Sequence, residues 1–135
     1  MTALDLSTPI DGTTLLLRRV GPRWVIRDKQ SGAARLSSGA FQELPKGSGR
    51  VSVTLEDDLL ARGASYEDAL FGQADYGLVA VKAQVVYDAD RDVERTPTGD
   101  DPSHGDIVGS ISGSFRDLLA SQAVWLIRSA EELVA

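Results

Sequence analysis

The apolar residues of this chain fall into short segments with an alternating pattern, and this spacing limits most strongly the folds open to it. The clearest segment covers residues 50–55, where Val51, Val53 and Leu55 share one face of an extended strand. Glycine and proline separate such segments, because neither residue continues a strand ladder well. We therefore expect an α+β fold, with a small, mostly antiparallel sheet and a long C-terminal amphipathic helix packed on one face.

The same pattern predicts several further strands. The longest apolar region, residues 76–87, alternates like a half-buried strand, and a helix from Ala80 onward is the alternative. Shorter strands are predicted over residues 14–20, 23–28, 33–36 and 106–108. Only Gly21 and Pro22 separate the first two of these short strands, so we expect them to pair as an antiparallel hairpin.

The predicted C-terminal helix covers residues 114–134. Its apolar side chains recur every three to four residues, which is typical of one helical face. This stripe includes Phe115, Leu118, Leu119 and Leu126. Ser114 and Asp117 have the spacing of a capping box, with the shorter acid in place of glutamate. The helix is therefore expected to begin at Ser114 and to cover the sheet.

The length of 135 residues fits one folded domain. Residues 1–13 contain Pro9 and Gly12 and show no clear period, so they are expected to form an N-terminal arm. Residues 14–135 are expected to form a single α+β domain.

Composition excludes several kinds of chemistry. The chain has no cysteine and one histidine, so disulfides, thiolate nucleophiles, cysteine-ligated zinc and histidine-rich zinc sites are not expected. We expect neither a metal site nor a cofactor. No apolar stretch approaches the roughly 20 residues of a membrane span. The first 11 residues carry two acids and no basic residue, unlike a secretory signal, so a cytoplasmic location is expected.

The net charge of −6 is unevenly distributed along the chain. Residues 1–50 hold eight basic and four acidic side chains, and residues 51–135 hold six basic and sixteen acidic ones. An acidic protein binds generic nucleic acid poorly, because such binding depends on neutralising phosphates. We therefore expect a protein partner, with a basic one favoured, and neither nucleic acid nor membrane as partner. The basic first half leaves room for a local anion site.

His104 is the candidate catalytic residue. It lies between Asp101 and Asp106, and an imidazole flanked by carboxylates can act as a general acid or base near neutral pH. No GxSxG motif is present to position a serine nucleophile beside it. The alternative is a loop histidine that hydrogen-bonds to the backbone and fixes the turn after Pro102.

Candidate ligand-binding or anion-binding residues lie in the first half of the chain. Arg18, Arg19 and Arg35 can grip phosphate or carboxylate, and Ser37 and Ser38 supply nearby hydroxyls. Successive strand residues point to opposite faces, so Arg18 and Arg19 are not expected to serve one site together. The alternative is that these arginines lie on an exposed sheet face or pair with the acidic second half.

Two loops offer weaker motifs. Residues 109–114 are rich in glycine and serine and precede the predicted helix, so they can either cradle an anion or simply cap the helix. Residues 88–94 have acids at positions 1, 3, 5 and 7 of a calcium loop. However, Val93 and Gly99 occupy positions where that loop requires glycine and glutamate, which favours a solvated acidic loop.

Several segments together resemble a group of small bacterial hypothetical proteins with the layout R-x-S-S-x-A-F … P-x-H-(A/G)-x-(I/V)-x-G. The matching segments are LRR at 17–19, RLSSGAF at 35–41, VSV at 51–53, YGL at 76–78 and DPSHGDIVG at 101–109. The resemblance covers about residues 15–126. It implies a bacterial source and a cytoplasmic setting, and it implies no reaction.

A second resemblance is to ADP-ribosyltransferase-like proteins, which place an arginine on an early strand, then a serine pair and later a catalytic glutamate. Arg18, Ser37 and Glu56 follow this order, although the intervals are short for that fold.

Two functions from different classes remain open. The first is a non-catalytic interaction or accessory protein of a bacterial multi-gene system, which the absence of a catalytic motif favours. The second is a small hydrolase or transferase that acts on a phosphorylated or nucleotide-like ligand. The second requires His104 and an arginine or serine of the first half to meet in one pocket.

Overall fold

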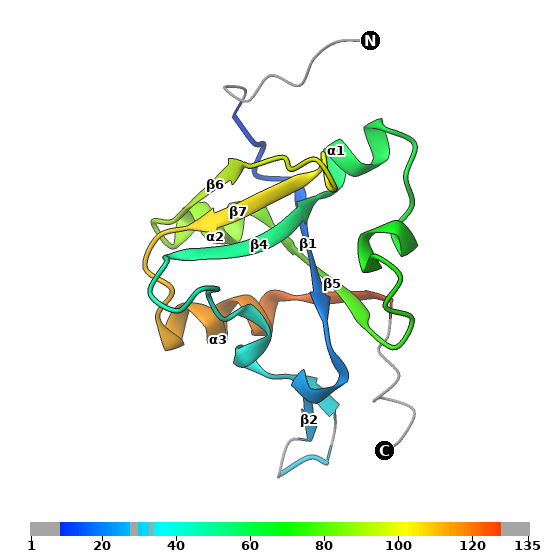
Figure 1. Ribbon diagram of the computed structural model, residues 1–135. Helices are drawn as coiled ribbons and strands as arrows, with labels where there is room; N and C mark the ends of the chain where they lie inside the picture. Colours follow the sequence, from blue (N-terminus) through cyan, green and yellow to red (C-terminus); the bar gives the residue numbers. More distant parts are fainter. Residues whose placement is uncertain (1–8, 28–29, 33, 128–135) are drawn as a thin grey trace.

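A six-stranded antiparallel sheet forms the centre of the computed structural model, which describes residues 9–27, 30–32 and 34–127 (Figure 1). Its strand order is β6-β7-β4-β1-β5-β8. These strands are β1 (Leu15–Val20), β4 (Arg50–Leu55), β5 (Gly77–Lys82), β6 (Asp92–Arg95), β7 (His104–Val108) and β8 (Val124–Ile127). A separate antiparallel pair consists of β2 (Val25–Arg27) and β3 (Ala34–Leu36).

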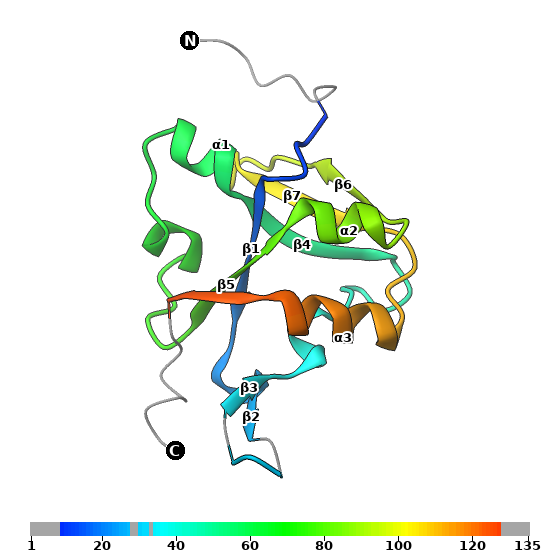
Figure 2. The ribbon, with the colours of Figure 1, turned by 180° about the vertical axis from the view of Figure 1, so that it is seen from behind.

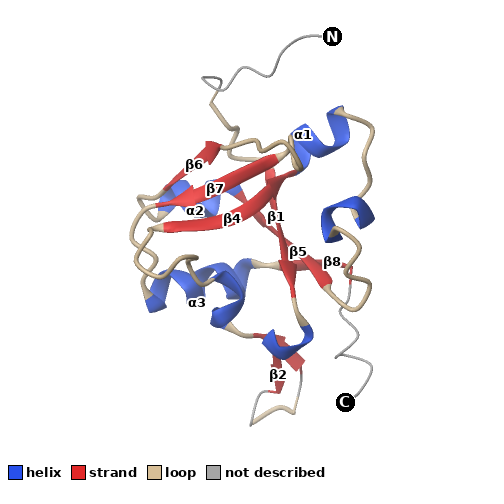
Figure 3. Ribbon diagram, viewed as in Figure 1, coloured by secondary structure: helices blue, strands red, loops and turns tan. Residues whose placement is uncertain are grey.

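Short helices surround this sheet (Figure 3). The α-helices are α1 (Glu56–Ala61), α2 (Ala83–Asp88) and α3 (Gly113–Gln122). The 3-10 helices are η1 (Pro22–Trp24), η2 (Ser38–Phe41) and η3 (Glu67–Leu70). None of the helices in the described part of the chain is long and apolar enough to cross a membrane.

The main core lies between one face of the sheet and the helices α2, α3 and η2 (Figure 2). Alternation along β4 places Val51, Val53 and Leu55 on this face, where all three are buried. The core extends to residues near the N-terminus, because Ile10 is buried and its carbonyl oxygen accepts a hydrogen bond from the Tyr87 hydroxyl at 2.7 Å.

The opposite face of the sheet is covered over only part of its width. Leu17 of β1 and Leu78 of β5 pack there against Leu59 of α1 and Leu70 of η3. Further along the sheet, the same face of β4 and β7 carries polar side chains, Ser52 and Thr54 among them. The boundary between these two parts positions the candidate site.

The α+β class and the mostly antiparallel sheet are confirmed, but the long C-terminal helix is wrong. Helix α3 ends at Gln122, after 10 residues, and its N-cap is Ser112 rather than Ser114. Residues 124–127 instead form β8, which pairs with β5. Valine, tryptophan and isoleucine favour a strand, and Trp125 packs against the main core while Leu126 and Ile127 pack against the second cluster. Residues 128–134 of the predicted helix lie outside the described residues.

Two predicted strand arrangements also differ from the structure. The hairpin of residues 14–20 with 23–28 is wrong, because β2 pairs with β3 while β1 pairs with β4 and β5. The strand predicted over residues 76–87 ends at Lys82, and helix α2 follows at once. Strand β6 overlaps residues 88–94, for which a solvated acidic loop is predicted, and it pairs with β7 through four residues.

Candidate functional site

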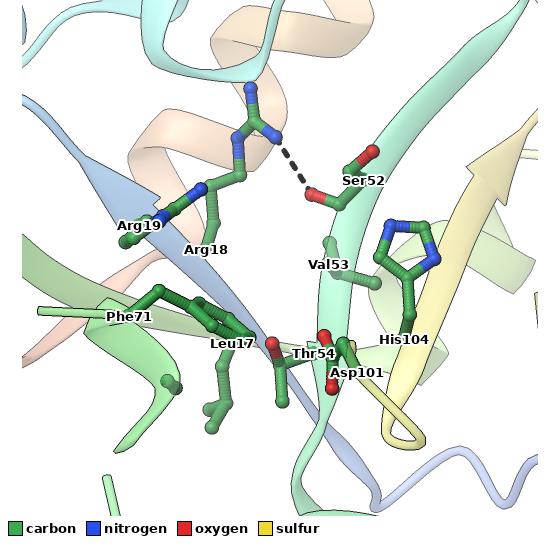
Figure 4. A pocket seen from close by; sticks show the side chains of 10 residues that line it. Leu17, Arg18, Arg19, Ser52, Val53, Thr54, Phe71, Asp101 and His104 are labelled. Atoms are coloured by element: carbon green, nitrogen blue, oxygen red, sulfur yellow. Dashed lines mark hydrogen bonds between the residues drawn. The ribbon is translucent and has the colours of Figure 1, made fainter. Parts of the chain in front are cut away.

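A pocket opens on the partly covered face, where β1 and β4 separate (Figure 4). The two strands pair only at Leu16 and Leu17, and beyond this point β1 continues beside β5 while β4 runs toward β7 (Figure 1). The cavity has a volume of about 180 Å³. Its lining consists of Leu17, Arg18, Arg19, Ser52, Val53, Thr54, Ala69, Phe71, Asp101 and His104.

Arg18 bridges the opening between the two strands. Its Nε–H donates to the Ala40 carbonyl oxygen at 2.9 Å, and Nη1 donates to the Ser52 carbonyl oxygen at 2.7 Å. A guanidinium carries five N–H donors, so the remaining ones are available to a ligand. Burial, and secondly the charge of Arg19, lowers the pKa of Arg18 to about 10. The group is therefore still positively charged at neutral pH.

The environment of Arg18 differs from that of three other arginines. Arg50 contacts the carboxylates of Glu94 and Asp106 at 3.0 and 3.1 Å. Arg95 contacts Asp58 at 3.1 Å, and Arg62 lies 3.9 Å from Asp101. No carboxylate within the described part of the chain forms a salt bridge with Arg18, whose acceptors there are two backbone carbonyls. Arg18 is thus a partly buried cation without an acidic partner among these residues.

Arg19 supplies a second positive charge at the edge of the pocket. Its side chain is exposed, and Nη1 donates to the Leu70 carbonyl oxygen at 3.4 Å. The guanidinium carbon lies 5.2 Å from the centre of the Phe71 ring, within the range of a cation–π contact. Phe71 follows η3 and has left-handed backbone angles, with φ 51° and ψ 42°.

His104 lies at the other end of the pocket, as the first residue of β7. Its backbone is paired with Thr54 of β4, which brings the ring to the pocket face. The Nδ1 atom lies 2.8 Å from the Thr96 hydroxyl oxygen and 3.1 Å from the Thr96 carbonyl oxygen. These contacts orient the ring, and the other ring nitrogen, Nε2, lies on the side of Ser52 (Figure 4).

The acids that flank His104 in the sequence do not hydrogen-bond to its ring. Asp101 is buried, accepts the backbone N–H of Ser103 at 3.0 Å and faces Arg62. Asp106 accepts a hydrogen bond from Arg50. The expected carboxylate–imidazole contact is therefore replaced by the contact with Thr96.

The structure brings together three of the predicted site residues: Arg18, Arg19 and His104. Arg35 and Ser38 instead line a different cavity of about 590 Å³ beside α3 and β8. The Ser37 hydroxyl caps η2 by accepting the backbone N–H of Gly39 at 3.2 Å. Glu56 does not line the Arg18 pocket, since it begins α1 and accepts a hydrogen bond from the Tyr66 hydroxyl.

The alternation rule predicted separate sites for Arg18 and Arg19, yet both line one pocket. The rule describes side chains within a continuous sheet. Here β4 has already diverged from β1, so the Arg18 side chain reaches across the opening to the Ser52 carbonyl oxygen.

Sequence reasoning missed Ser52, Thr54 and Phe71. The first two could have been found, because the alternation that assigns Val51 and Val53 to the core assigns Ser52 and Thr54 to the opposite face. Nothing in the sequence places Phe71 beside them, because that proximity depends on how the chain returns from α1 to β5.

The two weaker loop motifs have structural roles. The Ser112 hydroxyl caps α3 by accepting the Phe115 N–H at 3.2 Å, and Arg91 donates to the Ser110 carbonyl oxygen at 2.9 Å. In the acidic loop, the side chain of Asp92 accepts the N–H of Val93, and Glu94 pairs with Arg50. Within the ranges that the structure describes, no group of three or more histidine or acidic side chains is arranged to hold a metal ion.

The pocket combines two guanidinium groups, two hydroxyl side chains and an imidazole around a small space, together with the carboxylate of Asp101, which faces Arg62. Such a set of hydrogen-bond donors suits an oxyanion, such as a phosphate or a carboxylate. Comparisons with models of known protein families, with curated proteins and with solved structures found no match. The geometry of the pocket is therefore the basis for a functional proposal.

Proposed function

We propose that the protein is a non-catalytic binding protein that holds the phosphate-like group of a small acidic ligand between Arg18 and Arg19. The observation that carries this proposal is the partly buried Arg18 guanidinium, which has free donors and, among the described residues, no carboxylate partner. Arg19 lies beside it in the same pocket and adds a second charge.

The physical argument rests on the cost of burying a charge. A cation withdrawn in part from water is unfavourable unless it is paired and hydrogen-bonded, and the two carbonyl oxygens beside Arg18 meet this need only in part. An anion in the pocket would complete the pairing through charge-assisted hydrogen bonds, which are the stronger kind. A cavity of about 180 Å³ is smaller than typical pockets for drug-sized molecules, so it suits one acidic group of a ligand.

The environment of His104 supports binding rather than catalysis. Its Nδ1 is fixed by Thr96, and no hydroxyl of the described residues hydrogen-bonds to Nε2. A nucleophile–base pair, the usual requirement for covalent catalysis, is therefore not assembled there. In this proposal the chain acts in the cytoplasm as an accessory protein of a bacterial system, and its acidic second half is available to a basic protein partner.

A second candidate function is a small hydrolase or transferase that acts on a phosphorylated ligand. The observation that favours it is that His104 shares one pocket with Arg18 and Arg19, with Nε2 facing the side of Ser52 (Figure 4). An imidazolium at this position could protonate a leaving oxygen while the arginines hold the phosphoryl group. Turnover of a phosphate monoester that disappears in His104→Ala would support this second function.

Calorimetric titration with inorganic phosphate tests the binding proposal. We expect saturable binding to the unaltered protein, and an affinity at least about tenfold weaker in Arg18→Met and in Arg19→Met. Arg35→Met is the matched control, because Arg35 lines the other cavity, and its affinity should stay within about twofold. Arg18→Lys should bind more weakly than the unaltered protein, since lysine keeps the charge but loses the planar donor pair.

Two results would contradict the proposal. One is an absence of phosphate binding to the unaltered protein at low ionic strength, where charge interactions are least screened. The other is equal loss of affinity in Arg18→Met and Arg35→Met, which would indicate general charge attraction rather than a site.

A further inference from the structure

Phe71 is an exposed aromatic residue at the rim of the Arg18 pocket. Its side chain is 45% exposed, although it also lines the cavity. Its φ of 51° is uncommon for a bulky residue, and the next residue, Gly72, has a φ of 82°. The turn alone therefore does not call for an aromatic ring at this position, since glycine or asparagine adopts such angles more easily. Bulky residues in such conformations concentrate at ligand-binding positions.

Arg19 lies over the face of the Phe71 ring beside the cavity, and we call this stacked pair the Phe71–Arg19 surface. The guanidinium of Arg19 lies 5.2 Å from the ring centre, and the Leu70 carbonyl oxygen accepts a hydrogen bond from Nη1. Guanidinium and phenyl groups are both surfaces on which aromatic rings stack. Both residues are exposed, so the stacked pair offers a planar group on which a further ring can stack.

The cavity is large enough for the acidic group of a ligand but too small for a whole drug-sized ligand. A space of about 180 Å³ suits the acidic group near Arg18, while the rest of the ligand must lie at the rim. The side chain of Phe71 lies at this rim (Figure 4). A ring attached to the acidic group through a short polar linker would reach it.

We infer that the ligand is a nucleoside monophosphate or a similar phosphate monoester with a planar ring, which stacks on the Phe71–Arg19 surface. This inference rests on the proposed function, because Arg18 must hold the phosphate for the ring to be placed at the rim. Stacking on an aromatic side chain is tolerant of the identity of the base, so no preference among bases is implied.

Titrations with adenosine monophosphate and with ribose 5-phosphate test the inference, since the two share the sugar phosphate and the second carries a hydroxyl in place of the base. We expect the nucleotide to bind the unaltered protein about tenfold more tightly, the size of effect typical of one stacked base. In Phe71→Leu the nucleotide should bind at most about twofold more tightly than ribose 5-phosphate. The affinity of this variant for ribose 5-phosphate should stay within about twofold of that of the unaltered protein. Phe71→Tyr, the matched control, keeps a planar ring and should keep the advantage.

The two possible failures can be told apart. If the unaltered protein binds both compounds equally, and Arg18→Met weakens both, the ring is not recognised and the inference is wrong while the proposed function stands. If neither compound binds the unaltered protein, the proposed function fails and the inference with it. Retained binding of ribose 5-phosphate by Phe71→Leu shows that the variant is folded, and a nucleotide advantage that persists in it would also overturn the inference.

Discussion

Replacing Arg18 with methionine removes the partly buried charge while keeping an unbranched apolar side chain in place of the arginine stem. Two opposing effects determine the change in the free energy of unfolding. Burial lowers the pKa of Arg18 from 12.5 to about 10, which corresponds to a cost of about 3 kcal/mol for keeping the charged group folded at neutral pH. Loss of the hydrogen bonds to the Ala40 and Ser52 carbonyl oxygens costs about 1–3 kcal/mol each. We therefore expect the effect of Arg18→Met on stability at pH 7 to lie between a gain of about 1 kcal/mol and a loss of about 3 kcal/mol.

The pH dependence of this difference has a definite sign. The pKa of Arg18 is lower in the folded protein than in the unfolded chain, so its unfavourable contribution is complete below the folded value. It is relieved as pH rises above about 10, because the unfolded chain then binds more protons than the folded one. Relative to Arg18→Met, the unaltered protein should gain about 1 kcal/mol between roughly pH 9 and pH 11.

Urea unfolding of both proteins, followed by circular dichroism at these pH values, measures the difference. A loss of more than about 4 kcal/mol in Arg18→Met at pH 7 would refute this account. Arg18 would then be a structural residue whose charge is paired within the fold, and its availability to a ligand would have no support.

The remaining predictions concern the fold and His104. Leu119→Ala should cost about 2–5 kcal/mol in a urea-unfolding measurement, since Leu119 is 0% exposed, whereas Leu118→Ala, at 37% exposed, should cost less than about 1 kcal/mol. His104→Ala should lower the free energy of unfolding by about 1–3 kcal/mol, because the contact with Thr96 is lost. His104→Asn can place an amide near the Nδ1 position and should restore part of this loss. Equal stability of His104→Ala and the unaltered protein would disprove the contact. Gly105→Ala should cost at least about 1–3 kcal/mol, because its Cβ would lie 2.9 Å from a backbone carbonyl oxygen of β6; an unchanged melting temperature would contradict this.

The parts of the fold that depend on local pattern were predictable from the sequence. Strand β4 lies at residues 50–55, where Val51 and Val53 alternate with polar residues, and both are buried as predicted. Ser38–Phe41 forms a single 3-10 turn that is capped locally by the Ser37 hydroxyl. In these cases neighbouring residues alone determine the outcome, because the period and the turn residues agree.

The parts that failed depend on contacts between distant segments. Residues 124–127 fit a helical stripe, yet pairing with β5 makes them a strand, so a tertiary contact overrides the local period. The local sequence pattern also did not predict which strands pair, since β1 pairs with β4 and β5 rather than with β2, the next strand in the sequence. Long-range pairing has no signature in a single sequence when the apolar runs are this short.

The candidate site was predictable only as separate residues. Arg18, Arg19 and His104 were identified from their chemistry. They line one pocket because β1 and β4 diverge, and this divergence cannot be predicted from the sequence. Arg35 has the same chemistry as Arg18 and lies in another cavity. Residue type thus indicates which side chains can bind an anion, and the sheet topology decides which of them act together.

The most direct test of the account is the resonance of the Arg18 side-chain Nε–H, followed by nuclear magnetic resonance during a phosphate titration. Anion binding by its free donors should shift this resonance in a saturable way, together with the backbone amides of Ser52 and His104, while the Arg35 side chain stays unchanged. Shifts that do not saturate, or that are as large at Arg35 as at Arg18, would show that the pocket is not an anion site.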